Sequence, residues 1–357
     1  MRELREQDLS DLVEGAAIFS SGGGGDPVVG LNIVEKLLEK RCPVRLIEPA
    51  EVPNAAMLVT FACVGATASI VHHSDAAVKT LSMLEKFLGT KAFAVIPAEL
   101  GGFSTLAAVD VAARHGIPLL DADGAGRAVP EMHLQTYTIH NNTESTPTLV
   151  ADIDARKMLL IKQAGDSEAI EQIARMLTGR WSPIIYSCHA GFTGKQARTS
   201  PVLNSLSKSI RIGMVLRKAV DPLKAILKET NGIRLFEGTV TDVKSETKDG
   251  FTWTTLKIDS AHGSSESKLE MRAKNELLVA YKDGQLVAVA PDIITTLSYE
   301  TCKYAPAEKV LEGNRLAIIG IQAPPQWRSP EGLRLWEGVL RRSGINEKYV
   351  PIEKLAK

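Results

Sequence analysis

The feature that most constrains the fold is a regular alternation of short apolar runs and amphipathic segments over the first 121 residues. The apolar runs, which are typical of buried strands, lie at 44–47, 57–64, 92–97 and 117–121. The amphipathic segments, which have helical spacing, lie at 28–40, 75–88 and from Gly101-Gly102 to about His115. Strands that alternate with helices of about a dozen residues predict an α/β domain, with a mainly parallel sheet and helices on its faces.

The pattern changes after about residue 165. Between residues 234 and 290, short runs alternate apolar and polar residues, as strands with one buried face do. Two Asp-Gly pairs, at 249–250 and 283–284, separate such runs and are strong hairpin signals. We therefore predict two domains: an α/β N-terminal domain over 1–164, and a β-rich C-terminal domain over 165–357 with an antiparallel, barrel-like sheet.

Three helix starts can be predicted from local sequence. Asp26-Pro27 and Ser200-Pro201 each combine an N-cap residue with a proline suited to the first helical position. Residues 327–341 have the apolar spacing of an amphipathic helix.

Composition excludes several classes of protein. Lys+Arg and Asp+Glu both number 42, so net charge gives no attraction to nucleic acid or to a membrane surface. The four cysteines are far apart, which predicts free thiols in a reducing, cytoplasmic compartment. Residues 52–74 carry no formal charge, but Pro53, Gly65 and two histidines favour a buried strand and a loop over a membrane span.

The first candidate site is the run Gly22, Gly23, Gly24, Gly25, followed by Asp26. Its amide groups could bind a polar ligand at a helix N-terminus, or the run could be a tight turn onto a capped helix. No Lys-Ser/Thr pair follows the glycines, and the Asp26 carboxylate would repel a phosphate, so no nucleotide is expected.

The second candidate is Glu99, which follows the strand 92–97 and precedes Gly101 and Gly102. Ligands of open α/β sheets bind at the carboxyl ends of the strands, and glycines let a ligand approach closely. Glu99 is therefore predicted to act as an acid, a base or a metal ligand, with a solvated carboxylate or a helix cap as the alternative.

The third candidate comprises Asp121, Asp123, Arg127 and Glu131, which follow another strand. Residues two apart in an extended segment point the same way, so Asp121 and Asp123 are expected to converge and to share a proton. A divalent metal, Zn, Mn or Mg, could neutralise them instead, although no ligand spacing is diagnostic. The alternative is an Asp-rich turn.

Histidines and a cysteine follow other apolar runs. His72 and His189 are candidate ligand-binding residues, and Cys188 is a candidate nucleophile if a histidine lies near it in space. A lone histidine is more often a surface residue or a satisfied core residue. The chain contains no GxSxG motif, which argues against a serine hydrolase of the common type.

Several blocks together resemble the S-methyl thiohydantoin desulfurase family, which is associated with hydantoinases. The blocks are GGGGDP at 22–27, IPAELGG at 96–102, DADGAGRAVPE at 121–131, APDII at 290–294 and PPQWRSPEGL at 324–333. Residues 66–73 and the segment after Leu333 depart from the family pattern.

The resemblance implies a hydrolase that acts on a small, five-membered cyclic ureide-like ring and releases methanethiol from an S-methyl thiohydantoin. It implies a polar core of Glu99, Asp121, Asp123 and Glu131, with the glycine run and Arg127 orienting the ring. We expect a homo-oligomer, the common state of such enzymes. Two alternatives are a non-catalytic ligand-binding subunit or sensor and, less favoured, a nucleotide-dependent enzyme.

Overall fold

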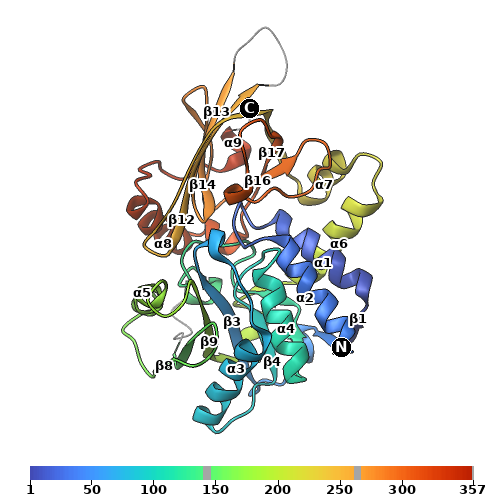
Figure 1. The fold of residues 1–357 in the computed structure, drawn as a ribbon, viewed down its shortest axis with the longest axis vertical. Coiled ribbons are helices and arrows are strands. Elements are labelled where there is room, and N and C mark those ends of the chain that lie inside the picture. The colour runs from blue at the N-terminus through green and yellow to red at the C-terminus, as the bar shows by residue number, and fades with distance from the viewer. Residues whose placement is uncertain (140–145, 261–266, 356–357) are drawn as a thin grey trace.

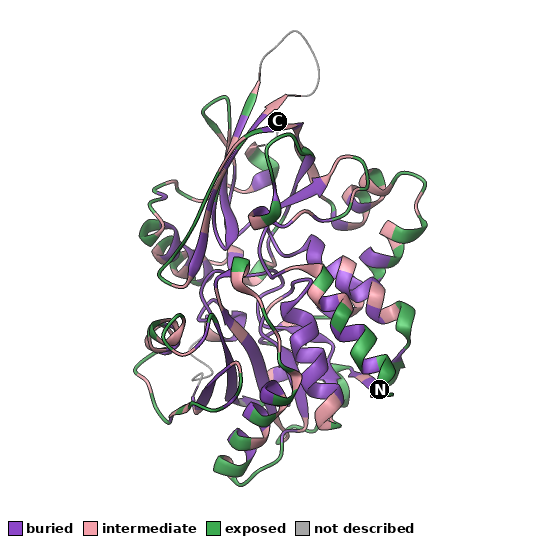
Figure 2. Cartoon of the chain, in the orientation of Figure 1, coloured by how far each residue is buried: buried purple, intermediate pink, exposed green. Residues whose placement is uncertain are grey.

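The computed structural model describes residues 1–139, 146–260 and 267–355. Two lobes lie one above the other in Figure 1, the lower built on a mixed sheet with helices and the upper on an antiparallel sheet. Buried residues line the strands and the inner faces of the helices, and they continue across the boundary between the lobes (Figure 2). The predicted fold class, an α/β part followed by an antiparallel part, is confirmed.

The lower lobe contains an eight-stranded sheet. In spatial order its strands are β1 (Arg2–Leu4), β2 (Val44–Ile47), β5 (Leu119–Leu120), β4 (Ala94–Pro97), β3 (Met57–Gly65), β9 (Ile184–Thr193), β7 (Thr148–Asp152) and β8 (Met158–Ile161). The four strands from β2 to β3 are mutually parallel, and the strands at both edges pair antiparallel. The parallel part is the part that the alternating pattern predicts, and β9 comes from after residue 165.

Helices cover this sheet and the boundary between the lobes. They are α1 (Glu6–Ile18), α2 (Pro27–Glu39), α3 (Ser74–Leu88), α4 (Ser104–His115), α5 (Ser167–Leu177), α6 (Ser205–Lys218) and α7 (Pro222–Thr230). Residues 104–113 of α4 are all buried, because α4 packs between the strands and its neighbours α2 and α3. The segment that precedes α4 is therefore held firmly against the sheet.

Of the two Pro-containing helix starts that the sequence predicts, the one at Asp26 is confirmed and the one at Ser200 is wrong. Asp26 caps α2 as predicted, since its side chain accepts a hydrogen bond from the Val28 amide at 3.0 Å. Ser200-Pro201 does not begin a helix: Val202–Leu203 form β10, which pairs with β6 (Ala122–Asp123), and α6 begins at Ser205. That strand pairing outweighs the local cap signal.

The C-terminal helix also begins later than predicted. The helix α8 spans Pro330–Arg342, because the Ser329 hydroxyl caps it by accepting from the Gly332 amide at 3.1 Å. Residues 325–328 form a separate 3-10 turn. A short helix, α9 (Ile352–Leu355), follows α8.

The upper lobe is a seven-stranded antiparallel sheet in the shape of a half-barrel. Its order is β15 (Gln285–Val289), β14 (Glu276–Lys282), β13 (Lys268–Lys274), β12 (Phe251–Ser260), β11 (Ile233–Lys248), β17 (Arg315–Ile321) and β16 (Ile293–Ser298). Both predicted hairpins are present: Asp249-Gly250 joins β11 to β12, and Asp283-Gly284 joins β14 to β15. All four turn residues have positive φ, as type I′ turns require.

Among the described residues, no helix is both long and apolar enough to cross a membrane. The uncharged stretch 52–74 contains the buried strand β3, as predicted.

The contact between α1 and α6 depends on two glycines. A Cβ atom at Gly15 would lie 1.7 Å from the carbonyl oxygen of Ser209, and one at Gly213 would lie 1.9 Å from that of Asp11. The helix backbones therefore touch, and the ion pair between Asp11 and Arg217, 2.8 Å, reinforces the contact. This contact holds α1 against α6, and so positions the glycine turn that follows α1.

We expect Gly213→Ala to destabilise the protein by about 3 kcal/mol, because neither backbone can move without disturbing a packed core. Gly338→Ala is the matched control: it lies inside α8, and the nearest atom to its added Cβ is a flexible Arg342 nitrogen at 3.5 Å. That change should stabilise the protein by roughly 0.5–1 kcal/mol through helix propensity. Urea denaturation measures both, and equal effects would contradict the close-packing argument.

Candidate active site

A cavity of about 50 Å³ lies where the two lobes meet. Its walls come from the glycine turn after α1, from β3, from the β4–α4 connection, from residues 129–135 and from the start of β14. The polar and thiol side chains on its walls are Cys63, Thr67, Glu99, Ser104, Gln135, Arg175, Asn275 and Glu276. Segments far apart in the sequence thus enclose one small polar space.

Glu99 lies on this cavity, just beyond the carboxyl end of β4. Its Oε2 accepts a hydrogen bond from the Val129 amide at 2.8 Å. Burial raises the pKa of Glu99 to about 7, and the charge of Asp123 adds to this rise. The hydrogen bonds from Val129 and Ser104 and the Arg127 cation lower the pKa, but by less. Near neutral pH, Glu99 can therefore either accept or donate a proton.

Glu276 is the second carboxyl group on the cavity, and sequence reasoning missed it. It begins β14, is 2% exposed, and its Oε1 accepts from the Gly24 amide at 3.3 Å. Burial raises the pKa of Glu276 well above its usual value and the nearby Glu99 adds to this, while Arg127 opposes it. Within the described part of the chain, its Oε2 has no hydrogen-bond partner.

A signal for Glu276 was present in the sequence. It is an ionisable residue at the head of the apolar run 277–280, every residue of which is buried. A carboxylate is almost never fully buried unless it is paired or serves a function, so this break in the strand pattern marked a candidate.

Asp123 and Arg127 lie close behind the two glutamates. The Oδ2 atom of Asp123 accepts from the amides of Ala125 at 2.8 Å and Gly126 at 2.6 Å. Burial raises the pKa of Asp123 to about 6, against these hydrogen bonds and that of Ser205. Asp123 is outside the cavity lining but near enough for its charge to raise the pKa of Glu99.

Arg127 is fully buried and joins the lobes. Its Nη1 donates to the carbonyl oxygens of Pro291 at 2.5 Å and Asp292 at 3.1 Å, and its guanidinium lies 4.7 Å from the centre of the Trp336 ring. Burial lowers its pKa to about 10, whereas the carboxylates Glu276, Asp292 and Glu99 favour the cation. Arg127 thus supplies positive charge next to the carboxyl groups of the cavity.

Asp121 occupies a different place from Asp123. Its carboxylate binds the backbone amide of Ser207 at 2.9 Å and also the Ser207 hydroxyl, at the start of α6. The expected convergence of Asp121 and Asp123 is not what the structure shows, because each carboxylate binds the backbone of a separate turn. The carboxyl group that interacts with Asp123 is Glu99.

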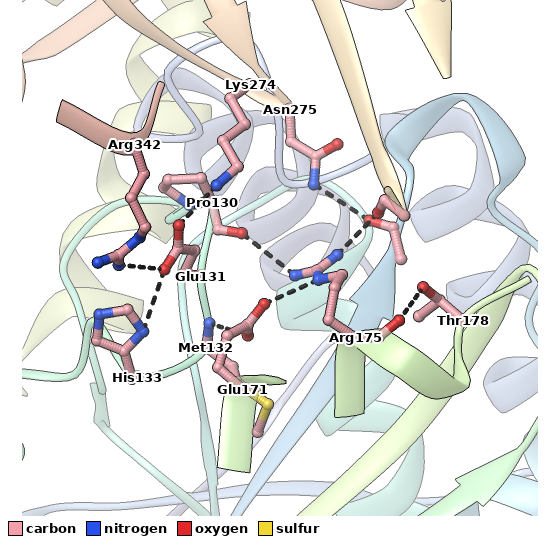
Figure 3. A network of polar contacts seen from close by, with 12 residues as sticks. Pro130, Glu131, Met132, His133, Glu171, Arg175, Thr178, Lys274, Asn275 and Arg342 are labelled. Atoms are coloured by element: carbon pink, nitrogen blue, oxygen red, sulfur yellow. Dashed lines mark hydrogen bonds and ion pairs between the residues drawn. The ribbon is translucent and has the colours of Figure 1, made fainter. Parts of the chain in front are cut away.

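Glu131 belongs to an ion-pair network outside the cavity (Figure 3). It binds Lys274 at 2.6 Å, Arg342 at 2.8 Å and His133 at 3.4 Å. Burial opposes its ionisation, but the Lys274 ammonium and the Arg342 guanidinium outweigh burial, and the pKa of Glu131 is lowered. Glu131 therefore remains a carboxylate that joins α8 and β13 to the loop after Arg127.

The glycine turn brings backbones together. Gly24 and Gly25 line the cavity, and both have positive φ, 64° and 76°. A Cβ atom at Gly24 would lie 2.7 Å from the Gly101 Cα, and one at Gly23 would lie 2.1 Å from Glu276 Oε1. The absence of side chains in this turn therefore lets the segment between β4 and α4, and the Glu276 side chain, lie directly against its backbone.

The other predicted residues of this region have packing roles. Gly22 lies against Leu277, and Gly102 lies against Pro27. Asp26 caps α2 and pairs with Lys309.

The histidines predicted to bind ligand lie off the cavity. His72 binds Asp110 at 2.8 Å through Nε2 and faces the Tyr186 hydroxyl at 3.3 Å through Nδ1. His189, on β9, contacts the Thr148 hydroxyl at 2.9 Å. Neither ring is among the residues that line the cavity.

Cys188 is buried and also lies off the cavity, and burial raises the pKa of its thiol. Cys63 does line the cavity, but burial, Glu99 and Cys188 raise its pKa as well. Both sulfurs stay protonated at neutral pH, so the carboxyl groups are better placed than Cys188 to exchange protons. Over the described residues, no three His, Cys, Asp or Glu side chains are grouped to hold a metal ion.

These features define a two-lobed α/β protein with a small cavity between the lobes and carboxyl groups whose pKa is raised by burial. The chain belongs to the S-Me-THD-like family: it matches the family's N-terminal domain over residues 7–162 and its C-terminal domain over residues 165–352. The family expected from the sequence blocks is therefore confirmed.

One similar solved structure is an X-ray crystal structure of a protein from Chromobacterium violaceum, a structural genomics target. It is 23% identical, has a TM-score of 0.80, and the match covers 99% of this chain and 100% of that one. At this identity the likeness supports the fold alone. A search of curated proteins finds no match.

Replacing Glu99 by Gln should stabilise the protein in a pH-dependent way. The pKa of Glu99 is about 4.5 in the unfolded state and about 7 in the folded state, so the folded state binds more protons between these pH values. Stability should therefore fall as pH rises through this window and stay lower above it. The difference in the free energy of unfolding between Glu99→Gln and the parent protein should therefore favour the variant by up to roughly 3 kcal/mol more at pH 8 than at pH 5. One pKa unit is worth about 1.4 kcal/mol.

Urea denaturation at the two pH values measures this difference. Glu35→Gln, which alters an exposed glutamate on α2, is the control and should show no such change between the two pH values. A parent protein whose stability relative to Glu99→Gln does not depend on pH would contradict the raised pKa.

Proposed function

We propose that this protein is a hydrolase of a five-membered, ureide-like ring, and that it releases methanethiol from an S-methyl thiohydantoin. The observation that carries the proposal is that Glu99 and Glu276 share one cavity and both have a raised pKa. Carboxyl groups held in different environments can divide the roles of base and acid at neutral pH.

Glu99 is the proposed base and Glu276 the proposed acid. Glu99 takes a proton from a water molecule as that water attacks the ring carbon bonded to sulfur, which gives a tetrahedral intermediate. The carbon–sulfur bond then breaks, and Glu276, whose pKa keeps it protonated, gives its proton to the leaving sulfur. The products are methanethiol and a ring with a new carbonyl group: the second proton of the water passes to the ring nitrogen, and the proton on Glu99 returns to Glu276 for the next turnover.

Gln135 supports the choice of a ureide-like ring. Its side chain lines the cavity and is 2% exposed, and neither its amide nitrogen nor its amide oxygen has a hydrogen-bond partner in the described ranges. Leaving such atoms unpaired costs about 1–3 kcal/mol per group, so the amide favours a ligand that offers both an acceptor and a donor. Adjacent C=O and N–H groups on a ring edge provide that pair.

Glu99→Gln and Glu276→Gln should each lower kcat at least about 100-fold, the usual contribution of a general acid or base. Methanethiol release from an S-methyl thiohydantoin, followed with a thiol reagent, is the measurement. Glu35→Gln is the control, and circular dichroism checks that each variant is folded. Full activity in either cavity variant would remove that residue from the mechanism, and ring binding without methanethiol release would favour the ligand-binding alternative.

The pH profile tests the assignment of the base. The kcat/KM value should rise as pH increases through about 7, because Glu99 must be ionised to accept the proton. Asp123→Asn should move this rise to lower pH, because the charge of Asp123 raises the pKa of Glu99. A rise that Asp123→Asn leaves in place would mean that another group limits the rate.

A further inference from the structure

A groove of about 890 Å³ lies next to the cavity, on the outer surface between α5 and the β11–β12 turn. Arg175, on α5, lines both the groove and the cavity. No other side chain in the described part of the chain lines both. The two spaces thus meet at a single side chain.

Arg175 is held across this boundary by three segments (Figure 3). Its guanidinium donates to Glu171 at 2.8 Å, to the carbonyl oxygen of Gly250 at 2.8 Å and to that of Pro130 at 3.3 Å. It also stacks on Phe251, with its central carbon 3.7 Å from the ring centre. Two of the three hydrogen bonds go to the backbone of segments other than α5, so the side chain closes the cavity by joining them.

The cavity is too small for the proposed ring as it stands. A cavity of about 150 Å³ holds benzene, and this one measures about 50 Å³. Its other walls include close-packed backbone, since a Cβ at Gly24 would touch Gly101 and one at Gly65 would lie 2.5 Å from the Pro183 carbonyl oxygen. Among the described residues, Arg175 is the side chain shared by the cavity and the groove, so a rotation of this side chain would join the two spaces.

The groove favours an uncharged group. The cations on its lining are Arg175, Lys248, Lys274 and Arg342, and the acids are Glu131, Glu168, Glu171 and Asp249. The four positive and four negative charges balance, so the groove favours neither an anionic nor a cationic ligand. Met176, Pro183 and Phe251 add apolar surface, and Met176 is 63% exposed.

We propose that the substrate ring carries an uncharged, apolar substituent that lies in this groove, and that Arg175 and Met176 determine specificity for it. The ring occupies the cavity once Arg175 has turned, and the substituent extends past Arg175 along α5. This inference rests on the proposed function, since it names the substrate class of the same site.

The test compares S-methyl thiohydantoins that bear hydrogen, methyl, propyl or isobutyl at the saturated ring carbon. Each buried methylene should lower KM about fourfold, because its transfer from water is worth about 0.8 kcal/mol. Met176→Ala should raise KM for the propyl and isobutyl rings several-fold and leave the unsubstituted ring unchanged. Met214→Ala is the matched control, an exposed methionine on α6 away from the groove.

Arg175→Lys keeps the positive charge and loses the planar set of donors that joins the three segments. It should reduce the preference for the longer substituents and lower kcat for every ring. A side chain with a merely structural role would change stability without changing the ranking of substituents.

Direct binding of the same compounds, measured by calorimetry with the Glu99→Gln protein, separates the two proposals. Substituent-dependent binding that is weakened by Met176→Ala supports the groove, whether or not the parent protein turns the compounds over. Turnover or binding that ignores the substituent overturns the groove and leaves the proposed function standing. Absence of both binding and turnover for all four rings overturns both.

Discussion

The structure depends on one buried cation, Arg127, at the boundary of the two lobes. Its guanidinium binds backbone carbonyl groups of the upper lobe, and the carboxyl groups Glu99 and Glu276 lie within its electrostatic influence. Burying a carboxylate is costly unless positive charge or hydrogen bonds compensate. Arg127 compensates in part only, which is why the pKa values of both glutamates are raised instead of lowered. A salt bridge of ideal geometry would have fixed them as carboxylates, as the network around Glu131 does.

The second constraint is steric and concerns the glycines. Gly24 and Gly101 touch backbone to backbone, and Gly23 leaves room for the carboxyl group of Glu276. Without these contacts the upper lobe could not place the Glu276 side chain of β14 in a cavity that is built mostly from the lower lobe. The glycine run therefore shapes the cavity: one of its amides binds Glu276, and its lack of side chains leaves room for that carboxyl group.

Local patterns in the sequence predicted the local parts of this arrangement. The apolar run 44–47 is a strand, Asp26 caps α2, and both Asp-Gly pairs form hairpins, because neighbours in sequence determine each of these features. Glu99 was predicted because ligands bind at the end of a parallel strand, and the structure places it on the cavity. Asp121 could not be separated from Asp123, because the partner of Asp121, Ser207, lies 86 residues away.

Glu276 and Arg175 were missed for a similar reason. The contact between Glu276 and Gly24 spans 252 residues, and Arg175 joins a loop at residue 130 to a turn at residue 250. No short-range periodicity encodes such contacts. The acidic residue at the start of an apolar strand was the one sequence feature that indicated such a contact.

Closure of the cavity and the acidity of its carboxyl groups are linked. Burial is the largest cause of the raised pKa of both Glu99 and Glu276, and Arg175 forms part of the wall that keeps bulk water from them. If Arg175 turned aside as proposed, water would reach the cavity, and the desolvation that favours the protonated forms would be reduced. Its return over a bound ring would restore that desolvation, with the substrate in place of water. In the proposed mechanism, the same side-chain movement would thus admit the substrate and restore the proton affinities that the reaction needs.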